Sequence, residues 1–140
     1  MTPEQIFSLA NGVALVGWLA LIFLPMQPRV SDLVAATAVP LLMAVLYTGL
    51  IAANFFQAEG GFSSLPDVAR LFSNPWLLLA GWVHYLAFDL LIGAWEARDA
   101  RARGLHHALL VPCLVFTFLF GPAGWLLYRV VCGSALRPKP

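Results

Sequence analysis

Four apolar stretches, each about twenty residues long, account for most of this chain. They cover approximately residues 6–25, 33–56, 75–96 and 107–132. A helix rises about 1.5 Å per residue, so about 20 residues can cross a hydrocarbon core roughly 30 Å thick. Charged residues make up 11% of the 140 residues, against about 25% in soluble domains. The sequence therefore predicts an all-α fold, an integral membrane four-helix bundle, in a single transmembrane domain spanning residues 1–140.

The connections between the stretches differ in character. In the long segment 57–74, apolar residues recur at helical spacing with Asp67 and Arg70 opposite them, which predicts a short interfacial helix in the headgroup plane between spans 2 and 3. Pro40 predicts a kink in the second span. The Gly121-Pro122 pair interrupts the fourth span, which we still expect to be one helix. On that helix Cys113 and Cys132 would lie about 28 Å apart, too far for a disulfide.

The charge of the chain limits its partners and its orientation. The formal net charge is +1, which gives no indication of a nucleic-acid or acidic partner. With four spans, the basic residues divide equally between the two membrane faces. One face has Arg70, Arg129, Arg137 and Lys139, and the other has Arg29, Arg98, Arg101 and Arg103. Short loops near span ends weigh most in the positive-inside rule. We therefore expect the loop that holds Arg98, Arg101 and Arg103 in the cytoplasm and both termini outside.

The third span carries polar side chains where lipid-soluble ones would be expected. A charge inside a span costs a few kcal/mol and normally faces a bundle interior or a cavity. At about 100° per residue, His84, Tyr85 and Asp89 share one arc with several aromatic residues. The opposite arc has no polar side-chain atom and consists of Leu79, Ala80, Val83, Leu86, Ala87, Leu90, Leu91 and Ala94. We expect that apolar arc to face lipid and the polar arc to face the interior.

General acid–base chemistry is the reaction type that suits the polar arc best. His84 and Asp89 would be the catalytic acid and base, and Tyr85 stands one turn before Asp89, where it can donate a hydrogen bond. The side chains expected to bind an apolar substrate are Trp82, Phe88, Trp95, Asn54 and Tyr47. The alternative is an interhelical hydrogen-bond network without catalysis. In the same way, a sector of small and polar residues in the fourth span, Thr117, Gly121, Gly124, Tyr128 and Cys132, is typical of helix association.

Metal and haem chemistry fit the spacing poorly. Glu96 closes the third span, so we expect it at the membrane rim beside His106 and His107. His84 would lie about 18 Å deeper than that rim, too far for one haem iron to be ligated from both levels. Glu96, His106 and His107 show no pair of ligands at i, i+3 or i, i+4 spacing on one helix. The sequence therefore predicts no metal and no cofactor.

Several strings in the second half of the chain resemble the hallmark of a known membrane family. They are the run from Asn74 to Leu90, Gly93-Ala94-Trp95, Arg98-Asp99-Ala100 and Phe120-Gly121-Pro122-Ala123-Gly124. These strings are similar to those of the abscisic-acid-deficient-four-like family. Its members are four-span proteins that plants require to make neoxanthin from violaxanthin in plastids, and its bacterial members have no known function. The resemblance extends over nearly the whole chain.

The resemblance implies a carotenoid or another long polyene lipid as ligand. The plant reaction opens an epoxide and forms an allene without net oxidation, so it needs an acid at the oxygen and a base at a carbon. Asp89 and His84 match the family string and would be that pair, with Tyr85 orienting. We therefore expect a cofactor-free isomerase of the carotenoid pathway or a non-catalytic pigment-binding or scaffold protein. The short chain without a transit segment indicates a bacterial inner membrane, and a groove between two copies keeps a homo-oligomer open.

Overall fold

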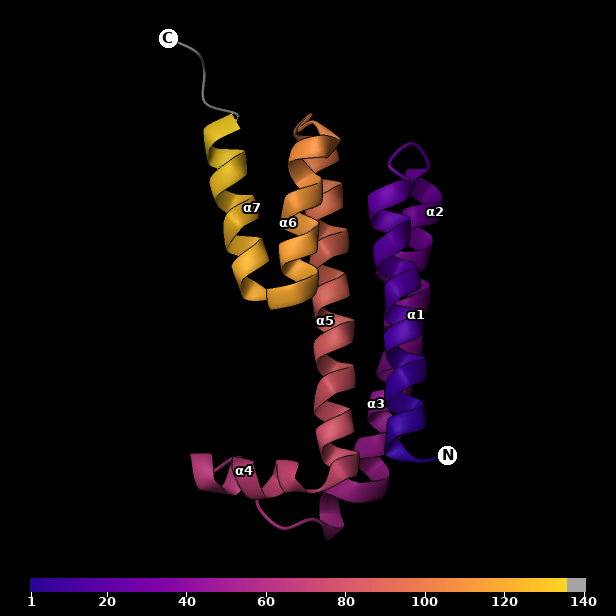
Figure 1. The fold of residues 1–140 in the computed structure, drawn as a ribbon, viewed down its shortest axis with the longest axis vertical. Coiled ribbons are helices and arrows are strands. Elements are labelled where there is room, and N and C mark those ends of the chain that lie inside the picture. The colour runs from indigo at the N-terminus through magenta and orange to yellow at the C-terminus, as the bar shows by residue number, and fades with distance from the viewer. Residues whose placement is uncertain (136–140) are drawn as a thin grey trace.

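The computed structural model describes residues 1–135, with the side chain of residue 135 left aside, and this part of the chain is almost entirely helical. The helices are α1 (Pro3–Phe23), α2 (Pro28–Leu33), α3 (Val39–Asn54), α4 (Leu65–Ser73), α5 (Pro75–Ala102), α6 (His107–Phe120) and α7 (Pro122–Ala135). Helix α5 is the central element, with α1 and α3 on one side and α6 and α7 on the other (Figure 1). Every candidate site described below therefore involves α5.

Local sequence explains where α5 begins. The Asn74 side chain accepts a hydrogen bond from the backbone nitrogen of Trp76 at 2.9 Å, which caps the first turn. Pro75 occupies the first helical position, where its missing N–H leaves no partner unsatisfied. At the other end the helix continues to Ala102, six residues beyond Glu96. The expected end of the third span near Glu96 is therefore about 9 Å short of the true end of the helix.

The second span is one continuous helical rod with an irregular middle. Residues Val34–Ala38 form a wider π-helical segment between α2 and α3. Pro40 is the second residue after this segment. Because proline has no N–H and its ring crowds the carbonyl four residues earlier, the α-helical bonding pattern cannot pass through it unchanged. The irregularity expected at Pro40 takes the form of this π-helical segment.

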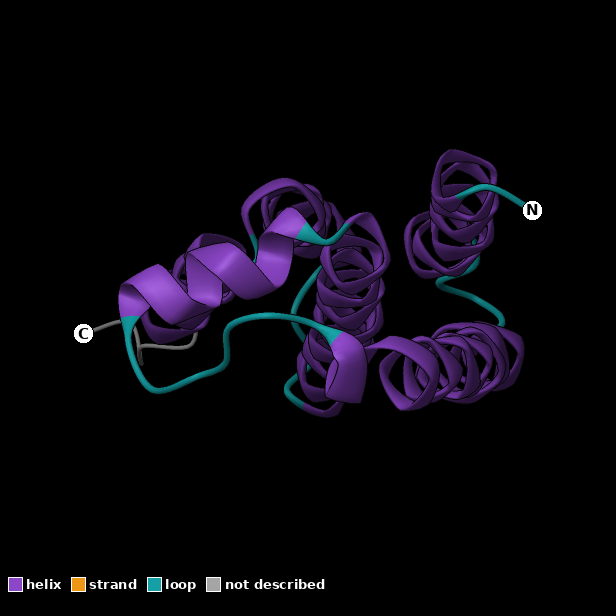
Figure 2. Ribbon diagram, turned by 90° about the horizontal axis from the view of Figure 1, so that it is seen from below, coloured by secondary structure: helices purple, strands orange, loops and turns teal. Residues whose placement is uncertain are grey.

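The short helix predicted between the second and third spans is present as α4. Its first turn is capped by Ser64, whose hydroxyl accepts a hydrogen bond from the backbone nitrogen of Asp67 at 3.3 Å. Helix α4 lies crosswise at one end of the molecule, and it extends from α5 toward the same side as α6 and α7 (Figures 1 and 2). Among the described residues its Leu71 is buried against the bundle.

The fourth span differs from the prediction. It is not one helix but a hairpin, because α6 descends along α5 only to about its middle and α7 returns beside it (Figure 1). Helix α6 has 14 residues, which is about 21 Å and too short to cross a bilayer. Gly121 makes the turn with φ of +51°, a conformation that residues with a side chain rarely adopt. Within residues 1–135, three helical rods are long and apolar enough to span a membrane, namely Pro3–Phe23, Pro28–Gln57 and Pro75–Ala102.

The hairpin also overturns two inferences that assumed a straight fourth helix. Cys113 and Cys132 lie on the two adjacent arms of the hairpin rather than at opposite ends of one helix, and both are buried free thiols. The end of α7 lies at the same end of the molecule as the α5–α6 loop, whereas the N-terminus lies at the other (Figure 1). The N-terminus and the end of α7 therefore lie at opposite ends of the molecule, whereas the four-span arrangement required the same end for both.

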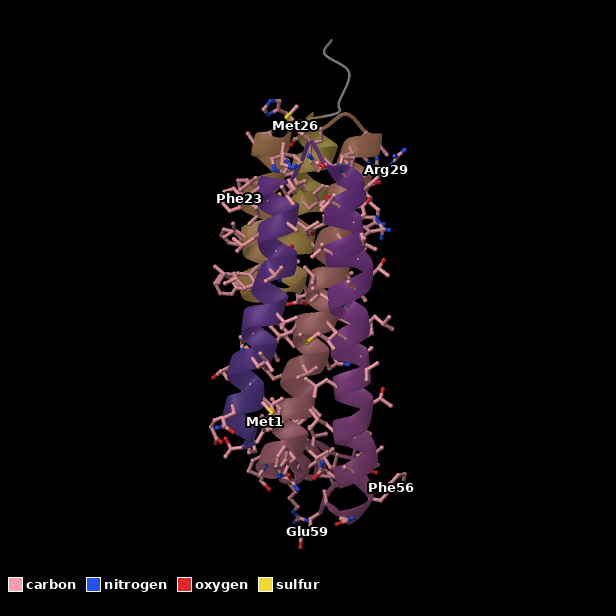
Figure 3. The ribbon with its side chains drawn as sticks, turned by 90° about the vertical axis from the view of Figure 1, so that its right-hand side faces the viewer. Met1, Phe23, Met26, Arg29, Phe56 and Glu59 are labelled. Atoms are coloured by element: carbon pink, nitrogen blue, oxygen red, sulfur yellow. The ribbon has the colours of Figure 1, made fainter. Side chains whose placement is uncertain are left out.

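Basic residues gather at one end of the molecule. Arg29 marks this end, and Phe56 and Glu59 mark the other (Figure 3). The arginines on α5, α7 and the α5–α6 loop lie toward the Arg29 end, so among the described residues only Arg70 of α4 lies at the Glu59 end. Arg137 and Lys139, which entered the charge comparison above, lie outside the described residues. The arginine distribution is therefore strongly asymmetric instead of balanced.

The apolar arc of α5 faces the protein and not the lipid. Its residues are the core of the molecule, with Ala80, Val83 and Leu90 each 0% exposed. Small residues allow the close approach: a Cβ at Gly93 would come within 2.6 Å of the Trp18 ring of α1. The prediction that the apolar arc faces lipid is therefore wrong, because this arc packs against α1 and α3. Part of the polar arc is exposed at the surface, and part is covered by the hairpin.

Candidate functional site

A buried carboxyl group lies at the contact between α5 and the hairpin. Glu96 is 0% exposed, so it is enclosed by the helices instead of being open at the membrane rim, as the sequence predicts. The hydroxyl of Thr117 on α6 lies 3.0 Å and 3.1 Å from the two carboxyl oxygens of Glu96. None of the ion pairs among the described residues includes Glu96. Burying an ionisable side chain in this way costs free energy, so such a residue is a functional candidate by default.

Two glycines allow the hairpin to close on α5 and on itself. Gly124 of α7 lies so close to Thr117 that a Cβ there would overlap its backbone nitrogen. Gly121 lies against Asp89, and a Cβ at this position would be 3.0 Å from the carboxyl oxygen Oδ1. The hairpin turn therefore places its backbone directly beside the Asp89 carboxyl group.

Asp89 itself is incompletely satisfied. Its Oδ2 atom is buried and has no hydrogen-bond partner among the described residues, although buried polar atoms are nearly always paired. The carboxyl group lies at an open groove of about 190 Å³, whose lining residues are Asp89, Ile92, Gly121, Pro122 and Trp125. Asp89 is therefore a polar group with unused hydrogen-bonding capacity at the edge of an apolar groove.

Tyr85 lies one helical turn before Asp89 and contacts the hairpin. Its hydroxyl donates to the backbone carbonyl of Phe118 at 3.4 Å, at the long end of the hydrogen-bonding range. The same hydroxyl lies near the Asp89 carboxyl group one turn further along α5. Tyr85 also lines a second groove of about 290 Å³ together with Phe72, Leu78, Gly81 and Trp82. The predicted proximity of Tyr85 and Asp89 is therefore present in the fold.

A third carboxyl group lies nearer the arginine-rich end of α5. Asp99 accepts a hydrogen bond from the hydroxyl of Tyr128 at 2.7 Å and pairs with Arg103 at 2.7 Å. Tyr128 is itself fully buried in the hairpin. Asp89, Glu96 and Asp99 thus follow one another on the side of α5 that faces α6 and α7.

His84 does not lie with Asp89. The two side chains line different grooves on α5. The His84 ring stacks on Phe88 at 4.5 Å and lies 5.6 Å from the Tyr47 ring of α3. Its groove, of about 250 Å³, is formed by α3, α4, α5 and the segment between α3 and α4. The structure therefore separates the two members of the predicted acid–base pair.

The residues predicted to bind substrate are also dispersed. Trp82 donates its indole N–H to the side-chain oxygen of Asn11 at 3.2 Å. Phe88 is 55% exposed, and Trp95 packs edge-on against Tyr128. Asn54 donates to the carbonyl of Leu50 in its own helix at 2.8 Å, and Tyr47 lies in the His84 groove. Of these five residues, Trp82 alone lines the groove that Tyr85 also lines.

The remaining histidines have structural contacts. His106 caps α6 by accepting the backbone N–H of Ala108 on Nδ1 at 3.3 Å. His107 places Nε2 at 2.9 Å from the carbonyl oxygen of Ile22, which links the hairpin to the end of α1. Within residues 1–135 no group of three His, Cys, Asp or Glu side chains is placed to hold a metal ion.

The sequence interpretation missed the partnership of Glu96 with Thr117. The spacing in the sequence groups Thr117 and Gly124 on one face of the fourth span, where they would be packing residues of a straight helix. The signal that could have revealed their role is the Gly121-Pro122 pair, since proline at the start of a helix after a glycine is typical of a turn between two helices. With that turn placed, Thr117 falls opposite Glu96.

Together, the fold and the buried carboxyl groups define a small helical membrane protein with three apolar rods and a short hairpin lying against the central one. The chain belongs to the ABA DEFICIENT 4-like family, whose model matches residues 5–128. The resemblance of the strings between Asn74 and Gly124 is thereby confirmed. Comparison with curated proteins found no match, and comparison with solved structures found none either.

Proposed function

We propose that this protein binds the oxygen-bearing end of a long polyene lipid, of carotenoid type, beside Asp89 and isomerises it by proton transfer. The unpartnered Oδ2 of Asp89 at the edge of an apolar groove carries the proposal. Inside a bilayer, an unused hydrogen-bonding group attracts the polar atom of an otherwise apolar ligand, since water is scarce there. Membership of the ABA DEFICIENT 4-like family supports the ligand class.

The shape of the surface supports an elongated ligand. The hairpin covers only the upper part of α5, and α4 lies below it on the same side (Figures 1 and 2). Two grooves lie on this side of α5, and we refer to the two together as the bay. Its lower groove includes Gly81 and Tyr85, and its upper groove includes Asp89. Gly81 and Asp89 are about 12 Å apart along the helix axis, so the bay suits one end of a long lipid while the rest stays in the bilayer.

The chemistry follows from the groups at the upper groove. Asp89 donates a proton to the ligand oxygen as a carbon–oxygen bond opens, and Tyr85 orients that carboxyl group. The carboxylate that remains accepts a proton from a ligand carbon. The proton given equals the proton taken, so the ligand is isomerised without an oxidant or a cofactor. His84 has no part in this step, because it lines a different groove.

The test is to express the protein in a bacterium engineered to make several carotenoids and to profile the pigments. We expect a product with the mass of its precursor in cells with the wild type. Asp89→Asn should remove it, because the amide cannot donate a proton in the same way. Glu59→Gln is the matched control, since Glu59 is an exposed carboxylate. Identical profiles for wild type and Asp89→Asn across all the pigments would contradict the proposed reaction.

A non-catalytic pigment-binding or scaffold protein is the second candidate. The separation of His84 from Asp89 favours it, because the predicted acid–base pair is not assembled. In this case a chromophore or a pigment-making enzyme would co-purify with the protein while no pigment is converted. Trp82→Ala should then reduce the bound chromophore, because it removes an aromatic wall of the lower groove.

We place the protein in a bacterial inner membrane, with the arginine-rich end of α5 in the cytoplasm. The asymmetric distribution of arginines supports this orientation through the positive-inside rule. The bay opens sideways toward lipid, so a second copy of the chain could close it, and a homo-oligomer is compatible with the proposal.

A further inference from the structure

We propose that the His84 groove is a second ligand site, which binds the carbonyl-bearing ring of a quinone-type lipid. This groove, of about 250 Å³, lies where α3, α4 and α5 meet, at the Glu59 end of the molecule (Figure 1). Its two polar side chains are His84 and Tyr47, and the reaction proposed at Asp89 uses neither of them. The site therefore goes beyond the proposed function and does not depend on it.

Phe72 of α4 separates the His84 groove from the bay. Its side chain lines both the groove that contains His84 and the groove that contains Tyr85. The ring lies against Gly81 of α5, where a Cβ atom would come within 2.9 Å of it. The glycine thus leaves the room that the Phe72 ring occupies. A ligand in the His84 groove therefore contacts a different set of polar groups from a ligand in the bay.

The walls of the His84 groove include several flat aromatic rings. Phe55 and Phe62 stack with an angle of 16° between their planes. Planar groups pack well against such faces. The aliphatic part of the lining consists of Ile51, Leu71 and Leu77. Pockets for whole drug-sized ligands are usually about 300 Å³ or larger, so this groove suits a single substituted ring.

Two unused hydrogen-bonding groups lie side by side in this apolar lining. The rings of Tyr47 and His84 are 5.6 Å apart. Within residues 1–135, neither side chain takes part in a hydrogen bond. His84 lies nine residues after Pro75, the start of α5, which is about 14 Å along the helix. Water is scarce at such a depth, so both side chains are available to a polar atom of a ligand.

A ring carbonyl fits these two groups. The tyrosine hydroxyl donates one hydrogen bond, and a neutral histidine donates one from its ring N–H. A carbonyl oxygen accepts two hydrogen bonds and brings no donor that would need a partner in the apolar lining. Quinones combine such an oxygen with a flat ring and an apolar chain. The chain can leave the groove beside Phe62 and Phe88, the ring stacked on His84, because these are 71% and 55% exposed.

Nitrogen NMR spectroscopy of the full-length protein in lipid nanodiscs, with isotope-labelled histidine, tests the site. The probe is decylubiquinone, and the His84 signal is identified by its loss in His84→Phe. We expect a saturable shift of this signal as the quinone is added. The signals of His106 and His107 should not move, because these rings contact backbone groups at the opposite end of the molecule.

Three variants of α3 separate hydrogen bonding from the insertion of an apolar chain. Tyr47→Phe should weaken quinone binding about fivefold, because it removes one hydrogen bond and keeps the ring. Thr48→Val is the matched control and should bind like the wild type, since the Thr48 hydroxyl is bonded to the Ala44 carbonyl within its own helix. Ile51→Phe puts a larger side chain into the groove and should weaken binding more than Tyr47→Phe.

An unmoved His84 signal at the highest quinone concentration would overturn the proposal. Equal affinities of Tyr47→Phe and Thr48→Val would overturn it too, because the groove would then hold only an apolar chain. If zeaxanthin displaced the quinone at a lower concentration than the quinone itself binds, the groove would belong to a polyene, and the proposal would be wrong. Asp89→Asn should bind the quinone like the wild type even when it abolishes pigment conversion. The two proposals can therefore fail separately.

Discussion

The two sides of α5 are packed by different means. Toward α1 and α3 the helix presents alanine, leucine, valine and Gly93, which make apolar contacts, and the hydrogen bond from Trp82 to Asn11 is the polar exception on this side. Toward α6 and α7 it presents Asp89, Glu96 and Asp99. From the hairpin, Thr117 hydrogen-bonds to Glu96, and Tyr128 hydrogen-bonds to Asp99. One side therefore holds neighbouring helices by close packing, and the other holds a short hairpin by buried hydrogen bonds.

This difference shows that an apolar arc does not identify the lipid-facing side of a membrane helix. Lipid tails are as apolar as leucine, so no hydrophobic force decides between lipid and another helix. Small residues decide instead, since they let backbones approach and gain dispersion contacts. The apolar arc of α5 is rich in alanine and meets small residues of α1, such as Ala14 and Gly17. Larger residues of the polar arc, among them Phe88, are left exposed.

The largest effect is expected from a test of the hairpin, on which the comparison depends. Single cysteines replacing Ser63, Ala102 and Ser134 should divide by side of the membrane in thiol labelling with an impermeant reagent. Ala102→Cys and Ser134→Cys should be labelled from the same side, and Ser63→Cys from the opposite side. Each cysteine should be labelled from one side of the membrane and not from the other. Labelling of Ser134→Cys from the Ser63 side would restore the four-span arrangement and remove the hairpin side of α5 altogether.

Tight packing within the hairpin can be tested with two glycines of α7. Gly124→Ala should destabilise the protein by about 3 kcal/mol, because its Cβ would overlap the backbone of Thr117. Gly133→Ala has open space around its Cβ and should be neutral or stabilising by up to about 1 kcal/mol. Unfolding in detergent measures both. Equal stabilities of the two variants would show that the arms are not in contact at Gly124.

The buried hydrogen bond between Glu96 and Thr117 can be measured by a double-mutant cycle. Glu96→Leu, Thr117→Val and the double variant should give a coupling free energy of about 1 kcal/mol in unfolding experiments, as is usual for hydrogen bonds between membrane helices. The physical reason is that either single change leaves one buried polar partner unpaired. A coupling near zero would mean that the hairpin side is held by packing alone, like the side of α1 and α3.

The smallest effect is expected at the one polar contact that α1 makes with the exposed part of α5. Asn11→Leu removes the acceptor of the Trp82 indole N–H and should cost about 0.6 kcal/mol. Asn11→Ser is a matched control, and it leaves the packing of the Trp82 ring against the Phe7 ring in place. A loss of several kcal/mol would indicate that polar contacts matter on both sides of α5, which would weaken the contrast drawn above.

Several elements were predictable because their signals are local. Asn74-Pro75 marks the start of α5 through capping, and the periodicity around Leu71 marks α4. The hairpin was not predicted, because a glycine–proline pair in a transmembrane helix can either kink it or reverse it. The position of Glu96 was not predicted either, since the apolar stretch ends there while the helix continues to Ala102.

The candidate site divides in the same way. Asp89 and Tyr85 were placed together correctly, because residues four apart on a helix share a face. The pairing of His84 with Asp89 stays a prediction of the sequence that the fold does not support, since neighbouring helices separate residues that lie on the edges of one broad arc. Thr117 as partner of Glu96 depends on the reversal at Gly121.

The sequence by itself determined that this is a helical membrane protein and that its first three apolar stretches are long enough to cross a bilayer. It also determined which of them carries the ionisable residues. Hydropathy and helical spacing are properties of single segments, so no partner is needed to interpret them. The tertiary structure decided which side of α5 faces protein, where Glu96 is buried, and that the last stretch turns back at its middle. Those features depend on contacts between distant segments. At Gly121 and Gly124, for example, the absence of a Cβ atom lets two segments approach closely enough to touch.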